Sequence, residues 1–421
     1  MYKKIILDNG LRIMLVPNKN TQAVTVLAVV GAGSKYENKK NNGISHFVEH
    51  MFFKGTKKRP NTLAISETLD RVGGFYNAFT SKEYTGYFAK VDSKHTDLAL
   101  DWVSDIFLNS KIDSKEIEKE RGVIIEELNM YLDTPVRHIR DLFETLLYGD
   151  QPAGWEIIGT KDNLKKVQRK DFIDYIKNHY SASNTIVCVS GNFNQVKMTE
   201  DIKRKFRVIN KQRPEGKIRV VEGQKEPQMH LKFKETDQTH FCLGVRAFDL
   251  FSPKIYVQEV LATILGGNMS SRLFIKVREK NGLAYYIKTD AESFTDSGYL
   301  VTQAGVPHTA LAKAIAMILK EYKNLAQVTV AESELKKAKD YLKGNLTLSL
   351  ESSDALASFY AGQELLTGKI LTLKDECAKI DKVKASEVRA LAKEIFKKQS
   401  LNLSIIGPHK NENQLQKLMR V

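Results

Sequence analysis

His46, Glu49 and His50 are the residues of this sequence whose types and spacing are best suited to chemistry. They form the pattern H-x-x-E-H. Residues four apart on a helix lie on one face, one turn apart, so the imidazoles of His46 and His50 can reach one metal ion. Glu49 then stands beside that metal without being a ligand. The order reverses the H-E-x-x-H pattern of zinc peptidases, and both patterns serve attack of water on a carbonyl.

A third metal ligand must come from elsewhere in the chain, because a catalytic zinc has three protein ligands and one open position. The stretch from Ser114 to about Leu132 is rich in helix formers, and on a helix Glu120 and Glu127 share one face with several apolar residues. Two carboxylates on an apolar stripe are costly unless something compensates them, as a metal would. An ordinary half-exposed helix with surface acids explains the same pattern equally well.

The composition is that of a globular protein. The 421 residues are 42 % hydrophobic and 27 % charged, and the length suggests two or three domains. The sequence has no run of 18 apolar residues and no signal-like apolar segment at its start, so we expect no membrane span. The three cysteines, Cys188, Cys242 and Cys377, are widely spaced, and we expect buried small hydrophobes rather than disulfides. These features together predict a cytoplasmic protein.

The net charge of +15 raises nucleic-acid binding as an alternative function. The lysines are scattered as short clusters such as Lys39-Lys40, and no helix-turn-helix, zinc-finger or RNP pattern is present. A solvated lysine-rich surface is the favoured interpretation, and no nucleic-acid partner is expected. Selection of acidic substrates by this charge stays open.

The chain contains a weak internal repeat. His95-Thr96-Asp97-Leu98-Ala99 recurs as His308-Thr309-Ala310-Leu311-Ala312, and a predicted pair of strands precedes each copy. An offset of about 212 residues places His46, Glu49 and His50 on Gln258, Leu261 and Ala262. The second half therefore lacks the metal-binding side chains and keeps only the shape.

Local patterns in the first half predict strands and helices without a βαβ rhythm. The Asp8-Asn9-Gly10 turn predicts a hairpin, and the apolar run from Ala23 to Val30 a buried strand. Helices are predicted at about 43–54 (capped by Asn41 or Asn42), 62–72, 95–109, 114–132 and 169–179, with strands over 75–91 and 185–190. The expected fold is α+β, with two structurally similar domains, each a mostly antiparallel sheet packed with helices. We expect these domains at 1–213 and 228–421, joined by a linker at 214–227 that is rich in Pro, Gly and charge.

The combined pattern resembles the pitrilysin family of metallopeptidases, which includes insulin-degrading enzyme and the mitochondrial processing peptidases. Glu127 lies 77 positions after His50, and Glu120 lies seven before Glu127, as in that family. The stretch Gly74-x-x-Asn77-Ala78-Phe79-Thr80 is similar to its substrate-binding edge strand. In the second half, Ser270 to Phe274 and the stretch from Arg278 to Tyr285 resemble its Arg/Tyr motif.

The resemblance implies a zinc endopeptidase that hydrolyses short or unfolded peptides, with one Zn²⁺ per chain. It implies that Glu127 completes the ligand set of His46 and His50, that Glu49 is the general base, and that Glu120 is an essential acid near the metal. The peptide would pair with the Asn77-Ala78-Phe79 strand by β-augmentation. Arg278 and Tyr285 would hold the substrate and stabilise the oxyanion. Without the resemblance, Arg278 would be a surface ion pair and Tyr285 a core aromatic.

The resemblance also bears on assembly. Large members of the family contain four such domains, which form two bowls that close around the peptide, whereas this chain has two. A homodimer is therefore expected, in which Arg278 and Tyr285 act in trans on the partner's zinc. Two alternatives stay open: a non-catalytic structural or assembly subunit of the same fold, and one half of a heterodimer.

Overall fold

The structure, a computed structural model, describes residues 2–419. These residues form two compact units, each assembled from three stretches of the chain. Unit 1 comprises 1–129, 155–218 and 348–370, and unit 2 comprises 130–154, 219–347 and 371–421. The division at 218/219 falls inside the segment predicted as a linker, where residues 211–225 carry neither helix nor strand. Within the described residues, no helix is long and apolar enough to cross a membrane.

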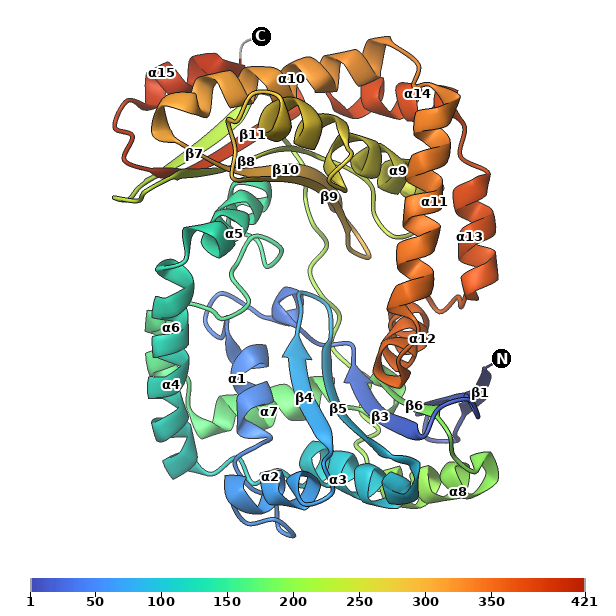
Figure 1. Cartoon of the computed structure of the whole chain (residues 1–421). Helices are drawn as coiled ribbons and strands as arrows, with labels where there is room; N and C mark the ends of the chain where they lie inside the picture. The colour runs from blue at the N-terminus through green and yellow to red at the C-terminus, as the bar shows by residue number, and fades with distance from the viewer. Residues whose placement is uncertain (1, 420–421) are drawn as a thin grey trace. The chain divides into compact units, whose positions relative to one another are not determined.

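Unit 1 is built on a six-stranded sheet in the order β1-β2-β6-β3-β5-β4 (Figure 1). Its strands are β1 (Lys3–Ile6), β2 (Arg12–Pro17), β3 (Ala23–Val30), β4 (Phe75–Thr80), β5 (Thr85–Asp92) and β6 (Thr185–Gly191). The predicted hairpin is present as β1 and β2, and its turn depends on Gly10, whose φ of 88° suits a residue without a side chain. The predicted buried strand is β3, which lies between β6 and β5.

Unit 2 repeats this topology in a five-stranded sheet, β7-β11-β8-β10-β9. Its strands are β7 (Gln228–Phe233), β8 (Thr239–Arg246), β9 (Tyr286–Ser293), β10 (Gly298–Val306) and β11 (Leu401–Gly407). In each sheet one pair is parallel, β2 with β6 and β7 with β11, and the remaining neighbours are antiparallel. Two similar, mostly antiparallel sheets packed with helices confirm the predicted fold class.

Helices cover the faces of both sheets. Unit 1 contains α1 (Ile44–Met51), α2 (Thr62–Asp70), α3 (Thr96–Asn109), α4 (Ser114–Leu132, whose last residues pass into unit 2), α6 (Lys161–Lys166), α7 (Arg169–His179), α8 (Gln195–Phe206) and α12 (Ser353–Thr367). Unit 2 contains α5 (Pro135–Tyr148), α9 (Ile255–Gly266), α10 (Leu311–Gln327), most of α11 (Glu332–Ser349), α13 (Leu373–Asp381), α14 (Ala385–Ile395) and α15 (Glu412–Gln416). The repeated His-Thr stretches lie at corresponding places, in the short turns that lead into α3 and α10.

The two halves of the sequence exchange one helix each. Helix α5 comes from the first half, yet Ile139 and Phe143 pack with Cys242 and Ile406 of the unit 2 sheet. Helix α12 comes from the second half, yet its residue Ala357 joins the core of the unit 1 sheet. The predicted domain boundaries at 213 and 228 treat each half of the sequence as one domain. The compact units differ from these domains because each unit contains one helix from the other half of the sequence.

The cysteines are unpaired in the structure. Cys188 and Cys242 are buried in the two sheets, as expected for small hydrophobes, and Cys377 is half-buried. Burial raises the pKa of the Cys188 thiol well above its ordinary value, so this sulfur stays protonated.

Candidate metal centre

Helix α1 carries the H-x-x-E-H pattern and begins at a buried carboxylate. Glu37 accepts hydrogen bonds from the backbone N–H groups of Gly43 and Ser45, both at 2.8 Å, and from the Ser45 hydroxyl at 2.5 Å. The predicted cap by Asn41 or Asn42 is wrong. The N-cap is Gly43, whose φ of 101° turns the chain into the helix, and the side chain of Asn42 donates to Glu37 instead. Burial raises the pKa of Glu37, and the four donors act in the opposite direction. A carboxylate also suits the positive end of a helix dipole.

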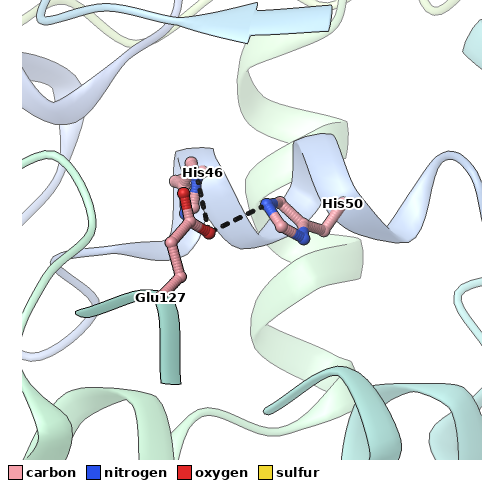
Figure 2. A group of neighbouring side chains, drawn as sticks. All are labelled: His46, His50 and Glu127. Atoms are coloured by element: carbon pink, nitrogen blue, oxygen red, sulfur yellow. Dashed lines mark ion pairs between the residues drawn. The ribbon is translucent and has the colours of Figure 1, made fainter. Parts of the chain in front are cut away.

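His46 and His50 project from α1 toward Glu127 of α4 (Figure 2). Oxygen Oε2 of Glu127 lies 3.7 Å from Nε2 of His46 and 3.5 Å from Nε2 of His50. The candidate ligand atoms of the three residues all lie within 4.8 Å of one another. Among residues 2–419, this is the only group of three or more His, Cys, Asp or Glu side chains with such spacing.

The three side chains fit a zinc ion in number, type and spacing. Zinc–ligand distances near 2.0–2.1 Å place two ligands of a tetrahedron about 3.3 Å apart, close to the observed separations. Burial, and then the neighbouring His50, lower the pKa of His46 to about 3. His46 is therefore neutral near pH 7, which is the form that binds a metal.

Glu120 contacts the far side of the His50 ring. Its Oε1 lies 2.9 Å from Nδ1 of His50, and its Oε2 lies 2.5 Å from Nζ of Lys54. Burial acts to raise the pKa of Glu120, but the hydrogen bonds from His50 and Lys54 outweigh it and hold the pKa below the ordinary value. A carboxylate at Nδ1 keeps that proton in place and leaves Nε2 free to be a ligand. His46 differs, since its Nδ1 is buried and has no partner among the described residues.

Glu49 stands beside the two histidines and is held by the sheet. The hydroxyl of Thr80, the last residue of β4, donates to its Oε2. Burial raises the pKa of Glu49, and the hydrogen bond from Thr80 acts against this rise. Helix α1 packs against β4, so the edge strand of the sheet supports the helix that carries the two histidines.

The strand expected to bind substrate is β4, which contains Asn77, Ala78 and Phe79. It lies at the end of the sheet order and pairs only with β5. The backbone N–H of Ala78 is taken by the side-chain oxygen of its own neighbour Asn77 at 2.9 Å. Phe79 lies over Gly86 of β5, where any side chain would collide with the ring. The strand therefore has an unpaired edge, and one of its backbone donors, the N–H of Ala78, is bonded to the Asn77 side chain.

Arg278 and Tyr285 belong to unit 2. Arg278 lies in a π-helical turn (Phe274–Glu279), stacks on the ring of Phe274 at 4.7 Å, and approaches Glu279 only to 4.0 Å. Tyr285 is 74 % exposed, so it is not a core aromatic. Both side chains are accessible for an interaction outside unit 2.

Helix α9 occupies the place of α1 in unit 2 and contains no histidine. Gln258, which the repeat aligns with His46, is buried and bonds to the backbone N–H of Phe248 and the hydroxyl of Ser293. At this position unit 2 has structural hydrogen bonds where α1 has a candidate ligand.

Three residues near the site were not identified from the sequence. Lys54 lies four positions after His50, so helical spacing could have indicated its position near Glu120. Thr80 lies at the end of the stretch singled out as a substrate strand, but nothing in the sequence connects it to Glu49. Glu37 carries no local signal, because its role depends on a loop that returns to the start of α1.

Comparisons with known proteins found similar sequences over most of the chain. Residues 12–161 match the family model described as insulinase (peptidase family M16), and residues 166–342 match the model described as peptidase M16 inactive domain. The uncharacterized zinc protease YmxG of Bacillus subtilis is 36 % identical over 98 % of this chain and 99 % of its own length. An uncharacterized zinc protease of Streptomyces coelicolor is 32 % identical over 97 % of this chain and 90 % of its own length.

Solved structures show the same architecture. A protease from Helicobacter pylori superimposes with a TM-score of 0.90 at 25 % identity, covering 97 % of this chain and 99 % of that one. A peptidase M16 inactive domain from Pseudomonas fluorescens has a TM-score of 0.89 at 14 % identity, covering 97 % of this chain and 98 % of that one. A chain of complex III from Candida albicans has a TM-score of 0.85 at 21 % identity, covering 99 % of both chains. The last two likenesses concern the fold alone.

Proposed function

Since this chain belongs to the insulinase-type, pitrilysin-like peptidase family M16, we propose that it is a zinc-dependent endopeptidase that hydrolyses short or unfolded peptides. The observation that carries the proposal is the convergence of His46, His50 and Glu127, with the carboxylate of Glu49 beside them. Its relatives are named zinc proteases. One Zn²⁺ per chain fits the single ligand group of the described residues.

The residues divide the chemistry between them. His46, His50 and Glu127 would hold the zinc, which when bound polarises the scissile carbonyl and lowers the pKa of water. Glu49 takes a proton from the attacking water and delivers it to the leaving amine as the C–N bond breaks. Glu120 holds the His50 ring through Nδ1, so it is a positioning residue.

The substrate backbone would add to β4 as a further strand. Main-chain hydrogen bonds give affinity in this mode and tolerate many sequences, with Asn77, Ala78 and Phe79 as the contact residues. The side-chain oxygen of Asn77 must leave the Ala78 N–H when a peptide binds. Because Thr80 continues the same strand and holds Glu49, peptide pairing and the general base are aligned by one element.

We infer that the working enzyme is a homodimer with a closed chamber, in which Arg278 and Tyr285 act on a peptide at the partner's zinc. The inference is supported by the exposure of Tyr285 and by the long 4.0 Å pair that the half-buried Arg278 makes with Glu279. An exposed arginine and tyrosine can supply donors to a developing oxyanion. Free cysteines suit a reducing compartment, which supports a cytoplasmic location.

The fold alone does not separate an enzyme from a structural subunit, because a chain of complex III shares it. The intact ligand set favours the enzyme.

Metal removal tests the proposal. Treating the purified protein with a chelator should abolish cleavage of an unstructured peptide, and adding one equivalent of Zn²⁺ should restore it. The reason is that the protein side chains of the site supply no Lewis acid of their own. Cleavage can be followed by mass spectrometry and zinc by elemental analysis. Unchanged cleavage by a zinc-free sample would rule the proposal out.

A further inference from the structure

A groove between α10 and α14 of unit 2 has several basic and no acidic side chains among its lining residues. It encloses about 1180 Å³. Lys320 and Lys323 come from α10, Arg389 and Lys393 from α14, and Lys398 from the turn before β11. The groove differs from an ordinary solvated surface, because five positive charges lie in one concavity.

Four of the five basic side chains of this groove, all except Lys398, have no ion-pair partner within the described part of the chain. Among residues 2–419, no acid forms an ion pair with Lys320, Lys323, Arg389 or Lys393, and all four are exposed. Lys320 and Lys323 are three apart on α10, and Arg389 and Lys393 are four apart on α14, so each pair repels. An external anion would relieve both repulsions.

The acids of α14 are directed elsewhere. Glu394 pairs with Lys254 at 2.6 Å, and Glu387 accepts from the backbone N–H of Lys384 at the start of the helix. The positive charge of the groove therefore persists although two glutamates lie on the same helix.

Apolar residues also line the groove and indicate the kind of anion. They include Ala316 and Leu319 of α10 and Ala390 of α14. The two aromatic residues of the lining, Tyr322 and Phe396, stack on each other with ring centroids 4.0 Å apart. Binding of single-stranded nucleic acid relies on aromatic faces, and this contact already uses one face of each ring. A lining of basic and apolar side chains instead fits a peptide with apolar anchors on one side and carboxylates on the other.

We propose that this groove is a docking site for an acidic, amphipathic segment of a partner polypeptide. Its apolar side chains contact the apolar lining residues between the two helices, and its carboxylates pair with the lysines and the arginine of the groove. The site is separate from the metal centre, and its occupancy requires no peptidase activity. Charge complementarity across such a surface governs association and makes it salt-dependent.

Fluorescence anisotropy tests the proposal directly. The protein is the full chain carrying Glu49→Gln, so that no probe is cut. The probe is a labelled peptide of about 18 residues made of glutamate and leucine, with leucine at every third or fourth position. Lys320→Glu with Arg389→Glu is the test variant. Lys313→Glu with Lys382→Glu is the control, since it changes the net charge equally at exposed positions of unit 2 outside the groove.

We expect salt-sensitive binding that weakens about tenfold or more in the test variant and less than twofold in the control. Thermal unfolding curves verify that both variants are folded. Equal weakening in both variants would show that net charge alone attracts the peptide and would overturn the proposal. The absence of binding, or equal binding of a peptide with lysine in place of glutamate, would overturn it too. Tighter binding of an oligouridylate of equal charge would show that the groove binds a nucleic acid rather than a peptide, and would also overturn the proposal.

Discussion

At the scale of single residues, the two histidines of the site differ in their surroundings. His50 has a carboxylate on Nδ1, whereas Nδ1 of His46 is buried without a partner. His46 is kept neutral by burial, and His50 is oriented by Glu120. The proposed metal site therefore depends on α4 twice, once for the candidate ligand Glu127 and once for Glu120, which contacts a histidine ring.

Asp101 of α3 provides a pH prediction away from the metal. It contacts Lys58, Arg59 (2.7 Å) and Lys205 (2.8 Å). Burial acts to raise its pKa, but the three cations outweigh burial and lower the pKa well below the ordinary value. Since the folded pKa is below the unfolded one, ionised Asp101 stabilises the fold above about pH 4, and this contribution is lost as the pH falls.

We expect Asp101→Asn to lower the free energy of unfolding by about 1–3 kcal/mol at pH 7. The difference from the unmodified protein should shrink as the pH falls below about 4, as followed by thermal unfolding. Asp97→Asn is the control on the same helix, because the exposed Asp97 pair with Lys197 is worth little. A loss equal for both variants, or one that does not change with pH, would contradict the assignment.

The sequence was sufficient to predict side chains whose roles depend on helical spacing. His46, Glu49 and His50 lie within one helix, and Glu120 and Glu127 on another, so periodicity predicts their common faces. That the two helices meet at one metal was implied by the resemblance, and the structure brings the three ligand atoms together. Lys54 lies four positions after His50, which helical spacing could have indicated, whereas Thr80 acts through a tertiary contact that no spacing reveals.

At the scale of elements, helix α1 is supported at two places, its first turn and the side chain of Glu49. Glu37 fixes its first turn, and β4 supports the side chain of Glu49 through Thr80. A short helix of eight residues is marginal on its own and needs such external support.

Glu37→Gln tests the role of the buried carboxylate. A glutamine amide would oppose the N–H groups of Gly43 and Ser45 with one donor, so we expect a loss of about 1–3 kcal/mol in stability and weaker zinc binding. The melting temperature and the zinc dissociation constant measure these effects. Glu126→Gln is the control, since Glu126 lies exposed on α4 as its helical position predicts. If the two variants behave alike, Glu37 does not organise α1.

Individual strands and helices were predictable where a single hydrophobic period or a single turn motif dominates the local sequence. Strand β3 and helix α7 have the predicted bounds, because one is a continuous apolar run and the other a short amphipathic helix. The motif helix is shorter than the predicted 43–54, since Phe52 ends it. The exchange of α5 and α12 was not predicted. An amphipathic helix shows which of its faces is buried, but not which of two similar sheets will cover it.

At the scale of the whole molecule, the two similar units carry different candidate functional groups. Unit 1 has the candidate ligand group, while unit 2 has Gln258 at the position of the first histidine and carries Arg278 and Tyr285. Because of the exchanged helices, neither consecutive half of the sequence contains a complete core.

Complementation between subunits tests the proposed action in trans. Glu49→Gln and Arg278→Ala subunits should each be inactive as homodimers. Mixed dimers should regain part of the activity, because one of their two sites combines an intact Glu49 with an intact Arg278. Native mass spectrometry verifies that heterodimers form. Confirmed heterodimers without recovered cleavage would exclude this arrangement and favour action within one chain or a different partner.

The central claim is that this chain binds zinc and uses Glu49 to hydrolyse peptides. The most direct measurement is zinc content and peptide cleavage on the same preparations of the unmodified protein and Glu49→Gln. We predict about one zinc per chain in both, with cleavage reduced by at least about 10³-fold in the variant, since only the general base is removed. Cleavage that persists in Glu49→Gln, or the absence of zinc from an active unmodified protein, would contradict the account.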